Sequence, residues 1–166
     1  MVGMGDLGGE EFLSAAAGVS ANGLVVVGVS RSPVSGERVE AFRSTAATGM
    51  AALGDLPGGE YASVATGVSS DGSVVAGSST SDASPSWGEA FRWTEATGLV
   101  GLGVLPGNEI PVSSPSRISA DGSVIVGWAS TENGREAFRW TESEGIVGMG
   151  DLPAGSFDSL ATGCGI

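Results

Sequence analysis

The sequence contains no histidine and no lysine, and its single cysteine is Cys164. Without histidine, the chain lacks the side chain that most often serves as a general base at neutral pH or binds zinc through imidazole. Without lysine, it cannot form a Schiff base with a carbonyl substrate. One cysteine can form neither an internal disulfide nor a cysteine cluster that holds a metal. Carboxylates are therefore the groups that remain for acid–base or metal chemistry.

Positive charge is also scarce, because nineteen acidic residues face seven arginines and the formal net charge is −12. Such a charge repels nucleic acid and anionic membranes and favours cations or neutral partners. No run of eighteen apolar residues is present, so no transmembrane helix is expected. The segment Met1–Leu7 lacks the charged and apolar regions of a signal peptide. We predict a folded acidic protein that neither binds nucleic acid nor inserts into a membrane.

The chain is built from repeats. The segments Glu40–Thr45, Glu89–Thr94 and Glu136–Thr141 share the pattern Glu-Ala-Phe-Arg-x-Thr at offsets of 49 and 47 residues, and a Gly-Asp-Leu motif recurs with them. A period of this length indicates propeller blades, solenoid coils or an array. We expect a single repeat domain over 1–166, with repeats at about 8–56, 57–105 and 106–152, a strand of a preceding unit at 1–7 and a partial fourth repeat at 153–166.

Each unit contains four short apolar runs separated by turn residues. Asn22-Gly23, Asp71-Gly72 and Asp121-Gly122 lie between the first two runs. Such dipeptides favour a hairpin with a type I′ turn, because glycine and asparagine tolerate positive φ. Four strands every 47 to 49 residues are typical of a β-propeller blade. The fold prediction is therefore all-β and propeller-like, with about three antiparallel blades and an extra strand at each end; an open β-array is the alternative.

Alternation in the third run supports sheets that pack on both faces. Phe91 and Trp93 share one face with Glu89, and Ala90, Arg92 and Thr94 share the other. Trp93 and Trp140 recur with the repeat and are interpreted as packing between blades. The recurring arginines, Arg43, Arg92 and Arg139, are interpreted as satisfied, partly buried guanidinium groups.

The combination Ser-x-Asp-Gly-Ser-Val-Val-x-Gly, Gly-x-Glu-Ala-Phe-Arg-Trp-Thr and Gly-Leu-x-x-Leu-Gly-Asp-Leu-Pro-Gly-Gly resembles the HAF repeat of bacterial extracellular and autotransporter proteins. The resemblance covers essentially the whole chain. It departs from the family at its namesake histidine, which is Glu40, Glu89 and Glu136 here. The resemblance implies a secreted or cell-surface repeat module and carries no catalytic motif onto these residues.

Three blades do not close a ring, because propellers typically have four to eight blades. Unfinished sheet edges favour pairing with another chain. We therefore expect self-association, most simply a homodimer that completes about six blades head to tail, or a chain that belongs to a longer protein.

Two columns of carboxylates recur and are candidates for a cation site. The first column consists of the aspartates of the Gly-Asp-Leu motif and has Val104 at its third position. The second consists of glutamates five residues later and has Ser156 at its last position. In a propeller, equivalent positions converge around the axis, and carboxylates without histidine or cysteine suit Ca²⁺. Turn capping by the aspartates is the structural alternative, and the Asp71-Gly72 and Asp121-Gly122 pairs are interpreted as turns. The candidate metal ligands are Asp6, Asp55, Asp151, Glu11, Glu60 and Glu109.

Two further tryptophans do not follow the repeat. Trp87 lies in a polar insert, and Trp128 occupies the column of Val29 and Ser78. Aromatic side chains near loops stack on sugars or other flat ligands. Trp87 and Trp128 are therefore candidate ligand-binding residues for a small molecule or glycan.

The first hypothesis is a binding or structural module, which the repeat and the lack of a nucleophile motif such as Gly-x-Ser-x-Gly support. The resemblance to HAF repeats implies that this module is extracellular. The alternative is a hydrolase in which channel-bound Ca²⁺ polarises an ester or lactone carbonyl and a carboxylate activates water. Asp55 and Glu60 are the catalytic candidates in that case. A glycosidase with paired carboxylates is a third possibility, because the spacing of these groups is not visible in the sequence.

Overall fold

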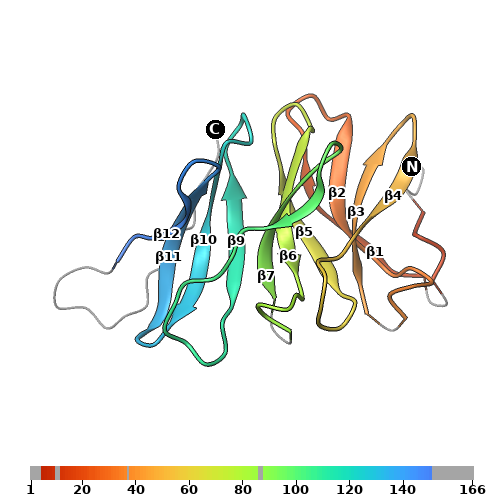
Figure 1. Ribbon diagram of the computed structural model, residues 1–166. Helices are drawn as coiled ribbons and strands as arrows, with labels where there is room; N and C mark the ends of the chain where they lie inside the picture. The colour runs from red at the N-terminus through yellow and green to blue at the C-terminus, as the bar shows by residue number, and fades with distance from the viewer. Residues whose placement is uncertain (1–4, 10–11, 37, 86–87, 151–166) are drawn as a thin grey trace.

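The computed structural model describes residues 5–9, 12–36, 38–85 and 88–150. The regular secondary structure in those ranges consists of β-strands, without a helix. The strands form three four-stranded antiparallel sheets in the orders β1-β2-β3-β4, β5-β6-β7-β8 and β9-β10-β11-β12, here called blades 1, 2 and 3. The three blades stand side by side in chain order (Figure 1). The strands are β1 Ser14–Val19, β2 Val25–Ser30, β3 Glu40–Thr45, β4 Gly49–Gly54, β5 Ser63–Val68, β6 Val74–Ser79, β7 Glu89–Thr94, β8 Gly98–Gly101, β9 Ser113–Ile118, β10 Val124–Thr131, β11 Gly134–Thr141 and β12 Gly145–Gly148.

The blades lie closest together where the first strand of one blade packs on the first two strands of the blade before it. β5 contacts β1 on one side and β9 on the other, whereas the fourth strands β4 and β8 touch only slightly. This wedge-shaped stacking places β1, β5 and β9 on the inner side of a ring and β4, β8 and β12 on its outer side. The all-β, propeller-like fold with three four-stranded blades is therefore confirmed. No extra strand forms within residues 5–7, where the backbone N–H of Leu7 instead donates to Ser30 Oγ at 3.0 Å; the rest of the expected end strands lies outside the described residues.

The three short hairpins form where the Asn-Gly and Asp-Gly pairs predicted them. The prediction of a type I′ turn was wrong. The backbone N–H of Gly72 donates to the carbonyl of Ser69 at 3.0 Å, so Ser70 and Asp71 are the central residues and the glycine follows them at φ 78°. Asp71 Oδ1 accepts hydrogen bonds from Ser69 Oγ and from the backbone N–H of Ser73. A carboxylate that caps its own loop makes this longer turn more favourable than the two-residue one.

These turns are also joined to one another from blade to blade. The N–H of Ala21 donates to the carbonyl of Ser70 at 3.0 Å, and the N–H of Ser70 donates to the carbonyl of Ala120 at 2.8 Å. We call this series the turn ladder. It fixes the first hairpins of the three blades in register at one end of the stack.

A glycine column explains how the first two strands of each blade approach closely. A Cβ on Gly77 would lie 2.1 Å from the carbonyl oxygen of Val64, and equivalent clashes would occur at Gly28 and Gly127. The ladder between the two strands slips by one residue at this level in every blade, which is a β-bulge. The recurring glycine of Val-Val-x-Gly is thus required by backbone packing.

The hydrophobic core lies between blades rather than within them. Phe91, Val75 and Ala65 of blade 2 pack on residues of blade 1. Ala76 and Ala90, on the opposite face of blade 2, pack on Ile125 and Phe138 of blade 3. The predicted alternation of the Glu89–Thr94 segment is therefore confirmed, because Phe91 and Ala90 face different neighbours.

Candidate functional site

The glutamate of the Glu-Ala-Phe motif is a structural clamp. The Oε1 atoms of Glu40, Glu89 and Glu136 accept hydrogen bonds from the backbone N–H groups of Gly54, Gly103 and Gly150 at 3.2, 2.8 and 2.7 Å. Each bond ties the start of a third strand to the segment that leaves the fourth. The recurrence of this residue is thus explained by the fold.

A serine at the start of the first strand joins each blade to the one before it. Ser63 Oγ donates to the carbonyl of Gly54 at 2.5 Å and accepts from the N–H of Ala41 at 3.0 Å. Ser113 makes the equivalent bonds to blade 2, at 2.6 and 2.8 Å. These hydrogen bonds satisfy backbone groups that the irregular end of the β3–β4 ladder leaves unpaired.

The recurring arginine and tryptophan also pack across the blade junction. The Nε–H of Arg43 donates to the carbonyl of Gly72 at 3.1 Å, and its guanidinium carbon lies 5.8 Å from the centroid of the Trp93 ring. Trp93 packs at the edge of the core between blades 1 and 2, and Trp140 does so between blades 2 and 3. The interpretation of these tryptophans as packing residues is confirmed.

Within the described residues, the predicted carboxylate columns do not gather at one site. Asp55 directly follows β4, on the outer side of the ring, and its Coulombic neighbour is Glu40. Burial, and then the charge of Glu40, raise the pKa of Asp55 above its usual range. Tyr61 donates to Glu40 Oε1 at 2.7 Å and belongs to the same cluster.

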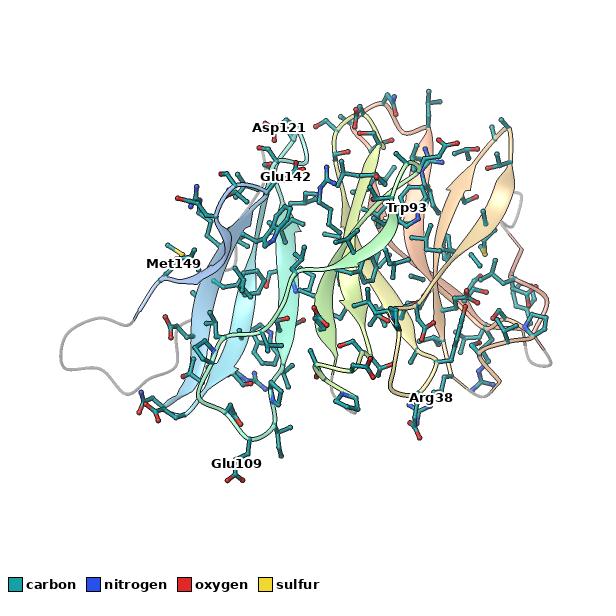
Figure 2. All side chains as sticks on the ribbon, in the orientation of Figure 1. Arg38, Trp93, Glu109, Asp121, Glu142 and Met149 are labelled. Carbon is teal, nitrogen blue, oxygen red and sulfur yellow. The ribbon has the colours of Figure 1, made fainter. Side chains whose placement is uncertain are left out.

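Glu60 lies in the same β4–β5 loop as Asp55, whereas Asp6 precedes β1 and Glu109 lies between β8 and β9. Asp6 Oδ1 accepts from the N–H of Gly8 in its own segment, and Glu60 forms an ion pair with Arg38. Glu109 is exposed at the same end of the molecule as Arg38 (Figure 2). Glu11 and Asp151 lie outside the described residues. Within the described ranges no three carboxylates or cysteines gather as a metal site. Ca²⁺ binding and the catalytic roles of Asp55 and Glu60 stay predictions.

The Asp-Gly pairs form turns, as the sequence predicted, and their aspartates accept hydrogen bonds within those turns. Hydrogen bonds from Ser69, and then from the backbone and side chain of Ser73, lower the pKa of Asp71 to about 2. Asp121 is held in the same way by Ser119 and Ser123, with a pKa of about 2. Asn22 accepts the corresponding bonds from Ser20 and Leu24 in blade 1.

Trp128 lies in a cleft of about 500 Å³ beside β9, where blades 2 and 3 meet. The guanidinium carbon of Arg135 lies 4.2 Å from the centroid of its ring. The cleft is lined by Ser78, Asn108, Val112, Ser114, Trp128, Ser130, Gly134 and Arg135. We call it the Trp128 cleft. Trp87, the second predicted ligand residue, lies outside the described residues.

The Trp128 cleft gathers residues that break the repeat. Trp128 replaces Val29 and Ser78 of the other units, and Arg135 stands where blade 2 has Gly88. The break has a structural cause: β10 and β11 are eight residues long and close through a two-residue turn at Glu132 and Asn133, whereas long loops join β2 to β3 and β6 to β7.

Asn108 shapes the cleft from the segment that enters blade 3. Its Nδ2 donates to the carbonyl of Thr131 at 3.0 Å, and its Oδ1 accepts from the N–H of Ile110 at 2.8 Å. Sequence reasoning found Trp128 but missed Asn108 and Arg135. Alignment of the three units could have found them, since glycine occupies position 59 where the third unit has Asn108, and position 88 where it has Arg135.

A smaller groove of about 350 Å³ runs along the inner strands. It is lined by three equivalent tripeptides, Ala17–Val19, Thr66–Val68 and Ser116–Ile118. The residues of this groove follow the repeat, so its shape follows from blade stacking.

Comparison with known proteins supports the fold and no more than the fold. No family model matches the chain, and no curated protein matches it. The solved structures that it resembles include TolB from Acinetobacter baumannii, at a TM-score of 0.56 and 14% identity over 83% of this chain and 32% of that one. A putative TolB from Agrobacterium tumefaciens aligns at a TM-score of 0.56 and 14% identity over 86% and 51% of the two chains. The chain thus spans a third to a half of these structures, and at this identity the likeness supports the β-propeller-like class alone.

In the described residues, no helix is long and apolar enough to cross a membrane.

Proposed function

We propose that this chain is a propeller-type binding module and that the Trp128 cleft is its ligand site. The observation that carries the proposal is the convergence of Trp128, Arg135 and Asn108, three departures from the repeat, in one cleft. Residues that recur in every blade maintain the stack, so residues that differ at one place are free to serve recognition.

The cleft favours a small ligand with a ring. Trp128 is half-buried, so part of the indole remains accessible to stack on a sugar or another flat group. Hydroxyl groups of Ser78 and Ser114 line the same space and can bond to the hydroxyls of a glycan. A volume of about 500 Å³ lies within the range of small-molecule sites.

The proposal is tested with a glycan array followed by calorimetric titration of the glycans retained. Trp128→Ala should weaken binding about tenfold or more, since stacked aromatic contacts dominate such sites. Its melting temperature should change little, because Trp128 belongs to neither core cluster. Ser123→Ala, at an exposed turn far along the blade, is the control and should bind as the wild type does. Unchanged affinity in Trp128→Ala would remove the cleft from consideration.

We also propose an extracellular or cell-surface setting, which rests on the resemblance to HAF repeats. Fractionation of cells that produce the natural full-length protein tests it. The hydrolase alternative gains no support from the described carboxylates, because no three of them gather as a metal site.

Self-association stays a proposal that the turn ladder supports. The carbonyl of Ala21 and the N–H of Ala120 are the two ends of the ladder in the described residues. They are complementary, so a second chain placed head to tail would continue the series. Light scattering tests this arrangement: a dimer is expected, and a monomer at high concentration would contradict it.

A further inference from the structure

We propose that the ligand of the Trp128 cleft carries a carboxylate, which pairs with Arg135 while a sugar ring contacts Trp128; an acidic sugar such as a uronic acid has this chemistry. This inference rests on the proposed function and names the class of its ligand.

The charge of the cleft differs from that of the molecule. The chain has nineteen acidic residues and seven arginines, yet none of the residues that line the cleft is acidic and one is an arginine. Within the described residues Arg135 forms no ion pair, and neither do Arg43, Arg92 and Arg117, whereas Arg38 pairs with Glu60 and Arg139 with Glu144. Arg135 is exposed and lines a cleft that has no acidic side chain, and such a cation is suited to an anion supplied from outside.

The placement of Arg135 suits carboxylate recognition. The guanidinium of Arg135 lies over the indole ring of Trp128, and this contact limits the freedom of the arginine side chain. A guanidinium held by its face keeps its N–H edges available, and two parallel N–H donors match the two oxygens of a carboxylate. Lysine would not offer this fork.

The serine hydroxyl groups that line the cleft differ in whether they already form hydrogen bonds within the protein. Ser130 Oγ donates to the carbonyl of Ile110 at 3.0 Å and accepts from the N–H of Val112 at 2.8 Å, so it maintains the wall of the cleft. Ser78 and Ser114 line the cleft and form no side-chain hydrogen bond within the part of the chain that the structure describes. They are placed to bond to the hydroxyl groups of a sugar whose carboxylate is held by Arg135.

The test compares an oligosaccharide that ends in glucuronic acid with its counterpart that ends in glucose, titrated calorimetrically. The wild type should bind the acidic probe at least tenfold more tightly. Arg135→Gln should remove this preference and keep the weaker binding of the neutral probe. Arg135→Lys should retain only part of the preference, and added salt should weaken the acidic probe more than the neutral one.

Arg117→Gln is the matched control, because Arg117 is an exposed arginine outside the cleft whose guanidinium donates to the carbonyl of Ser116. It should bind both probes as the wild type does. Equal binding of the two probes, with loss of both in Trp128→Ala, would overturn the carboxylate inference and leave the proposed site standing. Binding of neither probe would overturn the inference, and so would an equal loss of affinity for the acidic probe in Arg117→Gln and Arg135→Gln. Binding of no glycan on the array would overturn the proposed function as well.

Discussion

Arg43 and Arg135 both lie over a tryptophan ring, but the two contacts differ in what they join. Arg43 of blade 1 reaches Trp93 and the carbonyl of Gly72 in blade 2, so its contact crosses a blade junction. Arg135 lies over Trp128 within a single hairpin of blade 3. The first contact maintains the stack, and the second leaves a cation at a cleft. In a repeat protein, the same pair of residue types therefore has a role that depends on whether it recurs and on what it bridges.

The largest effect on stability should come from a residue that recurs in the repeat and packs between blades. Phe91 is fully buried between blades 1 and 2. Phe91→Ala should lower the free energy of unfolding by about 3–5 kcal/mol, since it removes a buried ring and leaves a cavity. Denaturant unfolding measures the change. Phe12, which is 77% exposed, is the control, and Phe12→Ala should change stability by less than about 0.5 kcal/mol.

The glutamate clamp should be next in magnitude. Glu89 accepts hydrogen bonds from the N–H of Gly103 at 2.8 Å and from Ser81 Oγ at 2.5 Å, and it is 8% exposed. Glu89→Ala should cost about 1–3 kcal/mol because both donors lose their acceptor. Glu95→Ala, at an exposed position, should be close to neutral. Equal thermal stability of the two variants would show that the motif glutamate does not clamp the blade.

Exchange of the two arginines by methionine sharpens the comparison itself. Arg43→Met should reduce stability by about 1 kcal/mol, through loss of the hydrogen bond to Gly72 and the contact with Trp93. Arg135→Met should leave the melting temperature nearly unchanged and impair ligand binding. The reverse order of melting temperatures would mean that the non-repeated hairpin, rather than the junction, carries the stacking energy.

The smallest effect concerns the turns. The folded-state pKa of Asp71 and of Asp121 is about 2, below the ordinary value of 3.8, so their ionised forms stabilise the fold above pH 3.8. This contribution is lost as pH falls from 3.8 through 2, as carbon-detected NMR titration of the two carboxyls should show. Asp71→Asn should change stability little at neutral pH, since Asn22 already serves the same turn in blade 1. A pKa near 3.8 in the titration would contradict the capping geometry.

The sequence allowed the periodic part of the structure to be predicted. The recurrence of Glu-Ala-Phe-Arg located the third strands, and alternation assigned Phe91 and Ala90 to opposite faces. It could not place the Asp column, because a period reveals equivalence between blades but not distance from the axis. Asp55 proved to follow an outer strand.

The Trp128 cleft was found only in part, for a related reason. Trp128 stood out as a non-repeated aromatic residue, whereas the importance of Arg135 depends on the tight turn at Glu132 and Asn133, which pairs Arg135 with Ser130 and brings it over the indole. The direction of a side chain across a strand pair depends on register, and register is set by the turn.

The turn ladder has a consequence for how such chains change over generations. Because Ala21, Ser70 and Ala120 are joined through backbone groups alone, the bonds of the turn ladder do not depend on which side chains stand at these three positions. A gene segment that encodes one unit can therefore be duplicated, deleted or exchanged, and the new copy finds the same partners. Substitutions in one hairpin at the opposite end, such as the Glu132–Asn133 turn, can then alter the proposed ligand site and leave the turn ladder unchanged.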